Sequence, residues 1–446
     1  MINFIKPFLI FIVLYHLFVT IIGYGVLWWA YPQLPALGRD AIRLLFFAVI
    51  CISNIKNIKT YLSTWKRPRI FFIIILIFGT GISLLKGKAP YDIFVGIKYG
   101  LLYLFIFLSA TFIGRIWNKK NSNTLNSEFW ILNFLKFLKY LLIIALLGWF
   151  LRQGLKFIRP DLFFTIGYGP LNDFKFWVKP PIYYLTWYQG TPRRQGLFSW
   201  PNNYGYFLIA FLPAILLFCR QKFASIKAFF SANKTAIINS IVIALWIAAI
   251  ALTLSRTAFI GGIVGLTFIN IKRIRTHKKL SVGIFLLLLA WLVGLSILKW
   301  ASTINHITAK FGSLQYVIQQ PSGYGLWTSW PAVLHNGTIL PENYYIQLMI
   351  DIGTIGFLLR TILVMNIMRI ARKTQRNIKT LKTNDQTIYL IRQWLNIGRF
   401  SLLIMGIFLH VFEDSMINYL FFISRGILSG YLSTYINKTP KILKKF

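Results

Sequence analysis

Three arginines and one glutamate stand out because they lie beside apolar segments, where an ionisable side chain is costly and usually has a partner or a function. Arg193 and Arg194 precede an apolar run that begins near 201, Arg256 lies between two apolar runs, and Glu342 comes directly before another. An arginine fork can bind two phosphate oxygens at once, and a positioned carboxylate can act as a general base. These residue types therefore indicate a phosphate-bearing substrate and a proton transfer.

Each of these residues also has a structural explanation. The Arg193–Arg194 pair would suit lipid headgroups at a membrane surface, and Arg256 would suit a helix-capping role. Glu342 opens an apolar segment, where a carboxylate is favoured by the helix dipole. Asp351 lies two to three turns further on, and we interpret it as an internal partner for a buried Arg or Lys rather than as a catalyst.

Metal-ligating patterns are weak in this chain. The adjacent acidic residues Glu413 and Asp414 could hold Mg²⁺ or Mn²⁺, but an ion pair with an arginine is the better explanation for them. His306, His335 and His410 do not show the spacing of metal ligands. We therefore expect no metal and no cofactor.

The elements that position these residues must be membrane helices. The chain has 446 residues, of which 57% are hydrophobic and only 13% are charged, so it is too apolar for a soluble protein of this length. Its net charge of +39 would suggest nucleic acid in a soluble protein. Here most basic residues lie in short loops between apolar runs, as the positive-inside rule expects, and nucleic-acid binding is excluded for lack of a soluble domain.

Apolar runs of about 20 residues recur from end to end, and each is long enough to cross a hydrocarbon core about 30 Å thick. We predict an all-α polytopic membrane bundle of about twelve transmembrane helices that forms a single membrane domain over 1–446. The predicted spans lie near 5–30, 41–56, 70–86, 92–114, 131–151, 201–219, 236–254, 257–271, 281–299, 343–368, 395–412 and 416–436.

The loops give the predicted orientation. One alternate set is strongly basic and is therefore expected in the cytoplasm, together with both termini. Its segments are Lys56 to Arg69, Arg115 to Lys120, Arg220 to Lys234, Lys272 to Lys279, Arg369 to Arg392 and Lys438 to Lys445. Two long loops, about 152–200 and 300–342, then lie on the outer face. We expect the active site there.

Four short motifs follow one another in the chain. The first is R-x-x-G-x-F-x-x-P-N, beginning at Arg194 or its neighbour Arg193, and the second is L-T-x-S-R-T at Leu252–Thr257. Next come G-x-G-L at Gly323–Leu326, and then Glu342-Asn343 followed after nine residues by Gly353-x-x-Gly356. Their order and common outward face resemble the O-antigen ligase and polymerase superfamily of membrane glycosyltransferases, over about residues 80–435.

This resemblance implies a GT-C-like helical fold and a polyprenyl-pyrophosphate-linked glycan donor. It also implies inversion at the anomeric carbon on the outer face of the bacterial inner membrane, without a metal. Arg194 and Arg256 would stabilise the leaving diphosphate, and Glu342 would be the general base. We predict that substrate is also contacted by Arg193, Asn202, Asn343, His335 and Tyr324.

A departure from one branch of the family favours one of two activities. Ligases that act on lipid A–core carry a histidine before the asparagine of the last motif, whereas this chain has Glu342 there, as polymerases often do. We therefore predict a polymerase that extends O-antigen, capsule or exopolysaccharide on an acceptor glycan, with a flippase or chain-length regulator as a possible partner. His335, seven residues upstream, keeps the ligase alternative open. A lipid-linked glycan flippase is the second alternative, and it would need charged residues in mid-span.

Overall fold

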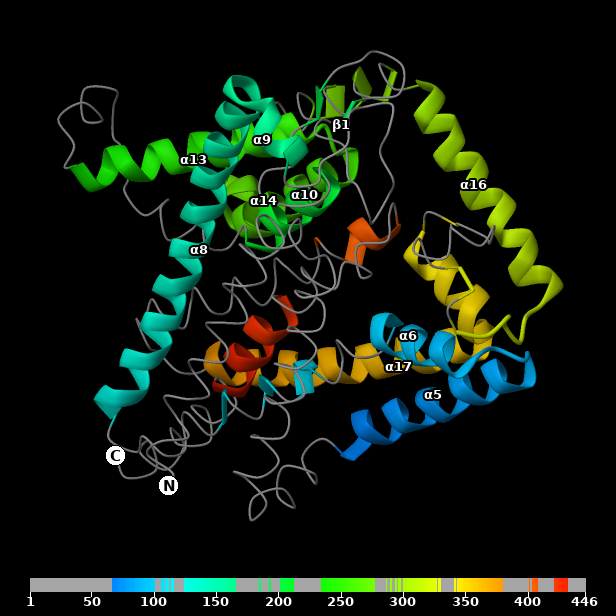
Figure 1. Ribbon diagram of the computed structural model, residues 1–446. Coiled ribbons are helices and arrows are strands. Elements are labelled where there is room, and N and C mark those ends of the chain that lie inside the picture. The colour runs from blue at the N-terminus through cyan, green and yellow to red at the C-terminus, as the bar shows by residue number, and fades with distance from the viewer. Residues whose placement is uncertain are drawn as a thin grey trace, which may run out of the picture. The chain divides into compact units, whose positions relative to one another are not determined.

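The computed structural model is helical, and the residues that it describes include one short pair of β-strands (Figure 1). It describes residues 66–100, 106–108, 110, 111, 114, 115, 124–165, 184, 185, 192, 193, 201–211, 234–276, 286, 289, 290, 293, 294, 296, 297, 300–326, 328, 329, 341, 343–379, 401, 403–407 and 421–431. The chain divides into two compact units. Unit 1 comprises 1–49, 128–299 and 389–402, and unit 2 comprises 50–127, 300–388 and 403–446.

Unit 1 contains most of the long helix α8 and the elements that follow it. They are α8 (Thr124–Ile158), α9 (Pro160–Thr165), β1 (Tyr184–Leu185), β2 (Pro192–Arg193), α10 (Pro201–Ala210), α13 (Lys234–Thr253) and α14 (Arg256–Thr276). The strands are antiparallel, with Tyr184 opposite Arg193. The bounds of α13 agree closely with the predicted span 236–254, whereas α14 extends beyond the predicted 257–271 into the basic loop.

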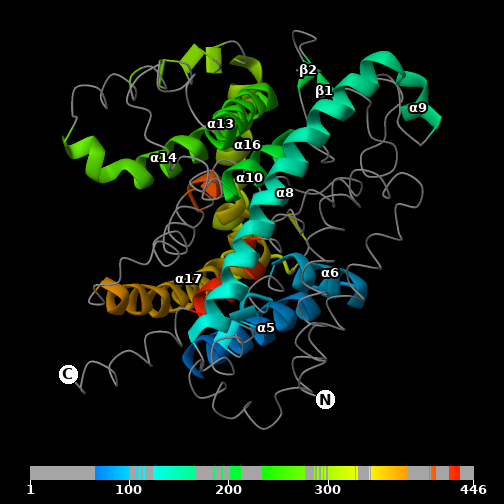
Figure 2. The ribbon, with the colours of Figure 1, turned by 90° about the vertical axis from the view of Figure 1, so that its left-hand side faces the viewer.

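The short helix α10 packs against both α13 and α14, and both ribbon views show the three together (Figures 1 and 2). Gly205 permits the approach to α14, because a methyl group added there would lie 2.6 Å from Cβ of Ala258. On the other side, Trp246 Nε1 of α13 donates a hydrogen bond to the Leu208 carbonyl at 3.1 Å. Small residues at such contacts let two helix backbones approach closely. This packing fixes the start of α10 close to the α13–α14 turn.

Unit 2 is built around α17 (Tyr344–Lys379). α5 (Lys66–Leu85) runs beside α17 (Figure 1), and α6 (Pro90–Gly100) follows α5. α16 (Trp300–Gln319) also contacts α17, through a cluster of Val317 with Ile346 and Ile350. The helical segment 421–431 meets 106–115 through glycines, since a methyl group added at Gly426 would lie 2.6 Å from the Phe107 carbonyl oxygen.

Two helical segments among the described residues have the length and composition of a membrane span, although the second is broken at Gly353. They are Lys136–Ile158 within α8 and Tyr344–Asn366 within α17, and both overlap predicted spans. The prediction of about twelve spans in a single domain stays a prediction, because much of it falls outside the described residues.

The structure differs from the predicted elements in two places. The predicted outer loop 300–342 begins with the 20-residue helix α16, whose exposed apolar residues Trp300, Ile304, Ile307 and Phe311 recur at helical spacing. Its many Ser, Thr, Asn and Gln residues hid that helix from a search for spans. The predicted span 343–368 is interrupted, because Gly353 has non-helical backbone angles (φ 71°, ψ 173°) inside α17.

Candidate functional site

In unit 1, Arg193 joins the first two motifs. Its Nη2 donates a hydrogen bond to Oδ1 of Asn202 at 2.7 Å, and its Nε donates to the Thr253 carbonyl at 3.1 Å. Asn202 is the second residue of α10, and Thr253 is the last residue of α13. When the first motif is counted from Arg193, it ends at Asn202. The Arg193 side chain therefore connects the two ends of the first motif, and it also contacts Thr253 of the second motif.

The turn between α13 and α14 is held by short polar side chains. Leu254 has a positive φ of 48°, which is uncommon for a residue other than glycine. The Thr253 hydroxyl accepts a hydrogen bond from the Ser255 amide at 3.2 Å, and the Ser255 hydroxyl accepts one from the Ala258 amide at 3.3 Å. Ser255 therefore takes the N-cap position of α14. Ser255 caps the start of α14, whereas the capping alternative for Arg256 concerns the carbonyl groups that end α13, so that alternative stays a prediction.

Arg256 is the first residue of α14 and is partly exposed. Arg193 contacts the first turn of α10 and the residue that ends α13, so two helix N-termini lie close to this arginine. Helix N-termini present free N–H groups and a favourable dipole to anions. With the Arg193 guanidinium beside them and Arg256 as the first residue of α14, this arrangement suits a phosphate or diphosphate.

In unit 2, Asn343 is the N-cap of α17. Its Oδ1 accepts hydrogen bonds from the amides of Tyr345 and Ile346 at 2.9 and 3.1 Å. Its Nδ2 donates to the Ile407 carbonyl at 2.9 Å. The side-chain amide of Asn343 thus accepts the backbone hydrogen bonds at the start of α17 and anchors that end to Ile407. The predicted contact of Asn343 with substrate stays a prediction. The cap role that competed with general-base chemistry at Glu342 is filled by the next residue.

The third and fourth motifs meet at the break in α17. The backbone amides of Tyr324 and Gly325 donate to the carbonyls of Ile350 and Asp351 at 2.8 and 3.0 Å, and the Thr354 amide donates to the Pro321 carbonyl at 2.9 Å. Backbone groups freed by a broken helix need such partners wherever water is excluded. Segment 321–325 therefore supplies what the helix loses at Gly353.

Asp351 is buried at the same break. One of its carboxylate oxygens accepts hydrogen bonds from the backbone amide and the hydroxyl of Ser329, at 3.0 and 2.8 Å. The sequence predicts a buried Arg or Lys as its partner, and that pairing stays a prediction, while Ser329 is one partner that the structure describes. The bonds fix the chain that follows segment 321–325 to α17, which supports the structural rather than the catalytic interpretation of Asp351.

Tyr324 lies half-buried beside α16, with its ring 6.3 Å from that of Tyr316 in a T-shaped arrangement. Its predicted contact with substrate stays a prediction. Six other residues singled out from the sequence lie outside the described residues, namely Arg194, His335, Glu342, His410, Glu413 and Asp414.

Buried cations are the feature that the sequence analysis missed. Arg152 and Lys156 of α8, Arg360 of α17 and Arg425 are all buried, although each lies in an apolar helical segment. Lys156 Nζ lies 5.6 Å from the centroid of the Phe163 ring. The signal was available, since a lone basic residue inside an apolar run is a candidate functional or structural group by default.

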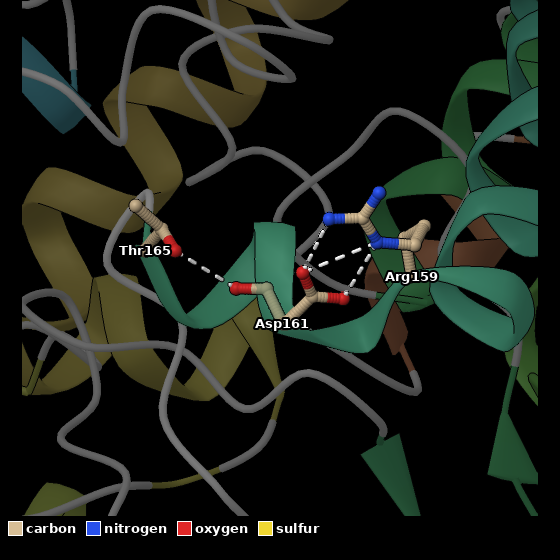
Figure 3. Close-up of polar contacts among 3 residues, drawn as sticks. All are labelled: Arg159, Asp161 and Thr165. Carbon is tan, nitrogen blue, oxygen red and sulfur yellow. Dashed lines mark hydrogen bonds and ion pairs between the residues drawn. The ribbon is translucent and has the colours of Figure 1, made fainter.

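A contrasting arginine lies at the junction of α8 and α9 (Figure 3). Arg159 forms a two-pronged ion pair with Asp161, with an Nη2–Oδ2 distance of 2.8 Å, and more than half of each side chain is exposed. The hydrogen bond raises the pKa of the Arg159 guanidinium and lowers the pKa of the Asp161 carboxyl. Because its charge is matched by a carboxylate, Arg159 is poorly suited to hold a phosphate.

Within the described residues, no three His, Cys, Asp or Glu side chains are grouped so that they could hold a metal ion. The arrangement therefore offers cations and helix N-termini in unit 1, and in unit 2 a capped helix start directly after Glu342. A scan against protein-family models finds no match to this chain, and a search of curated proteins finds no similar sequence.

Proposed function

We propose that this protein is a metal-independent, inverting glycan polymerase of the bacterial inner membrane. It joins oligosaccharide repeat units that are carried on polyprenyl pyrophosphate, on the outer face of the membrane. The proposal includes about twelve spans, a GT-C-like bundle, cytoplasmic termini and an acceptor glycan as the second substrate. Its basis in the sequence is the ordered set of four motifs and the basic-loop asymmetry.

The observation that carries the proposal is the clamp formed by Arg193. The first two motifs are assigned to one diphosphate by the resemblance, although 60 positions separate Arg193 from Thr253 in the chain. Arg193 hydrogen-bonds to both, at Asn202 and at Thr253. This side chain therefore links the start of α10 to the turn that comes directly before Arg256.

In this proposal the arginines replace the metal of other glycosyltransferases. Negative charge develops on the diphosphate as the glycosidic carbon–oxygen bond breaks, and fixed cations that are already in place stabilise it without reorganisation. Arg194 and Arg256 contact the diphosphate oxygens, and Arg193 holds the two segments in place while adding its own positive charge. We expect activity to persist in EDTA for this reason.

Glu342 removes the proton from the acceptor hydroxyl as that oxygen attacks the anomeric carbon. A hydroxyl is a poor nucleophile at neutral pH, and a positioned base contributes roughly 10²–10⁴-fold to the rate. The capping of α17 by Asn343 supports this assignment, because the helix start does not need the Glu342 carboxylate as its cap.

The test is Glu342→Gln in purified protein supplied with lipid-linked donor. We expect donor binding to be retained and polymer formation to fall by about 10²-fold or more, since glutamine keeps the size but cannot take the proton. Asp161→Asn is the matched control, because it makes the same carboxylate-to-amide change in an exposed ion pair to which no catalytic role is assigned. Polymer formation by Glu342→Gln at the wild-type rate would remove the carboxylate from the mechanism and make His335 the next residue to test.

The buried cations favour one alternative, a flippase for the same lipid-linked glycans. Charged groups inside spans can line a path for an anionic substrate, and Arg360 and Arg425 are buried in apolar helices. The two functions separate in detergent, where there are no two compartments. Donor consumption and polymer formation there would support the enzyme, whereas donor movement across a vesicle membrane without new glycosidic bonds would support the flippase.

A further inference from the structure

Tyr344 and Arg360 touch each other although they lie 16 positions apart in the same helix. On a straight α-helix that separation is about 24 Å along the axis, which is beyond the combined reach of the two side chains. In the structure, Arg360 Nη2 donates a hydrogen bond to the Tyr344 hydroxyl, and Arg360 Cζ lies 4.8 Å from the centroid of the Tyr344 ring. The two halves of α17 must therefore bend toward each other between these residues.

A second contact across the same bend agrees with the first. The rings of Tyr345 and Phe357 meet edge to face, with their centroids 6.4 Å apart. The bend falls at Gly353, whose backbone is non-helical. Segment 321–325 forms hydrogen bonds with the backbone groups that the break leaves unpaired within α17. The bend is therefore held by these backbone bonds and by the side-chain contacts between the two half-helices.

The contact between Tyr344 and Arg360 is buried. Tyr344 is fully buried and Arg360 is 5% exposed. A buried cation is costly unless it is partnered, and Tyr344 offers it both a hydroxyl oxygen and the negative face of a ring. Either contact alone would be available to many tyrosines, but both together require one relative placement of the two half-helices.

The start of α17 is also tied down on another side. The Tyr345 hydroxyl donates to the Leu403 carbonyl at 2.7 Å, and Asn343 Nδ2 donates to the Ile407 carbonyl. The segment 403–407 and Arg360 thus hold the same helix start, and the residue that directly precedes it in the chain is Glu342.

We propose that Arg360 and Tyr344 form a latch that sets the angle of the broken helix and thereby positions Glu342 for transfer. Arg360 is a positioning residue in this assignment, since it acts through Tyr344 and does not itself meet the substrate. The catalytic consequence rests on the proposed function, whereas the role of the latch in setting the angle does not.

The experiment uses Arg360→Lys and Tyr344→Phe in the full-length protein, with Thr361→Val as the matched control. Lysine keeps the charge but loses the planar group, and phenylalanine keeps the ring but loses the hydroxyl. Thr361 is next to Arg360, and its hydroxyl bonds only locally in the described contacts, to the Phe357 carbonyl at 2.9 Å. Spin labels are attached at Ile318→Cys on α16, which packs against the first half-helix of α17, and at Ile362→Cys on the second half-helix. The distance between the labels reports the angle between the two half-helices. Cys51 and Cys219 are first replaced by Ser.

We expect both latch variants to broaden or shift the distance distribution between the labels. Their kcat should fall about 10- to 100-fold, as misplaced catalytic groups do, while KM for the lipid-linked donor stays within about twofold. Thr361→Val should change neither. A latch variant that stays folded with an unchanged distance distribution overturns the latch. A shifted distribution with unchanged kcat overturns the positioning of Glu342. If wild-type protein makes no polymer while the labels still respond, the proposed function fails and the role of the latch in setting the angle stands.

Discussion

The α13–α14 turn of unit 1 and the break in α17 of unit 2 both change the direction of a helical segment, but different contacts hold them in place. At both places a helix ends and another begins with almost no connecting chain, and a residue with positive φ makes the change of direction. At the first, Leu254 is surrounded by bonds from the side chains of Thr253 and Ser255, and Arg193 holds the Thr253 carbonyl. At the second, Gly353 is held mainly by backbone bonds from segment 321–325.

This difference determines which substitutions each junction tolerates. A turn built from side-chain hydrogen bonds loses about 1 kcal/mol when one bond is removed, because the others remain. A junction built from close backbone contact loses more stability on substitution, because any added atom separates the two segments. The first junction brings charged side chains to the turn, and the second gives a fixed support for the residues that follow.

Gly353→Ala should have the largest effect on folding. A methyl group there would lie 2.5 Å from both the carbonyl carbon and oxygen of Ser322, and the backbone angles are costly for any other residue. We expect a loss of about 3 kcal/mol or more of stability, seen as little monodisperse protein in detergent.

Gly312→Ala in α16 is the matched control, because nothing lies within 4 Å of its added methyl group. It should purify like the wild type. Normal yield and thermal stability of Gly353→Ala would show that segment 321–325 does not approach α17 as closely as the structure has it.

The sequence predicted several residues of both junctions, but it did not predict the contacts that those residues make. Arg193, Asn202 and the Leu252–Thr257 motif were identified from their types and positions, because charge beside an apolar run is conspicuous in one dimension. The hydrogen bonds of Arg193 depend on the packing of α10 against α14 at Gly205, which no local pattern reports.

The broken helix could not be predicted for a related reason. Residues 343–368 read as one apolar run, and glycines such as Gly353 and Gly356 are common inside membrane helices. The bend at Gly353 arises from contacts with Pro321 and with Arg360, which is far from Tyr344 in sequence. Likewise α16 was hidden, because its polar face lowered the hydropathy of a segment whose apolar residues still follow a helical period.

Asn202→Asp tests the side-chain junction with an intermediate effect. Aspartate keeps the acceptor oxygen for Arg193, but it matches the arginine's charge and repels a phosphate. We expect folded protein with KM for the lipid-linked donor raised about tenfold, which is the cost of a modest electrostatic loss. Asn203→Asp, on the partly exposed next residue, is the control and should change KM less. Equal effects of the two variants would mean that net charge near α10, and not the Arg193 clamp, controls donor binding.

The smallest effect is expected at the α8–α9 junction, where Arg159 and Asp161 form an exposed ion pair. Exposed pairs contribute little because water and salt already screen the charges. The pKa of Asp161 is lowered, so whatever stability the pair adds is present above the pKa of the unfolded chain and is lost as the pH falls through the lower pKa of the folded state. Asp161→Asn should therefore leave the Tm unchanged within error at pH 7, and the two proteins should become still more alike near pH 3. A fall in Tm at pH 7 as large as that caused by Gly353→Ala would show that a charged surface pair can hold a junction as firmly as backbone contact does, and the comparison between the two designs would not stand.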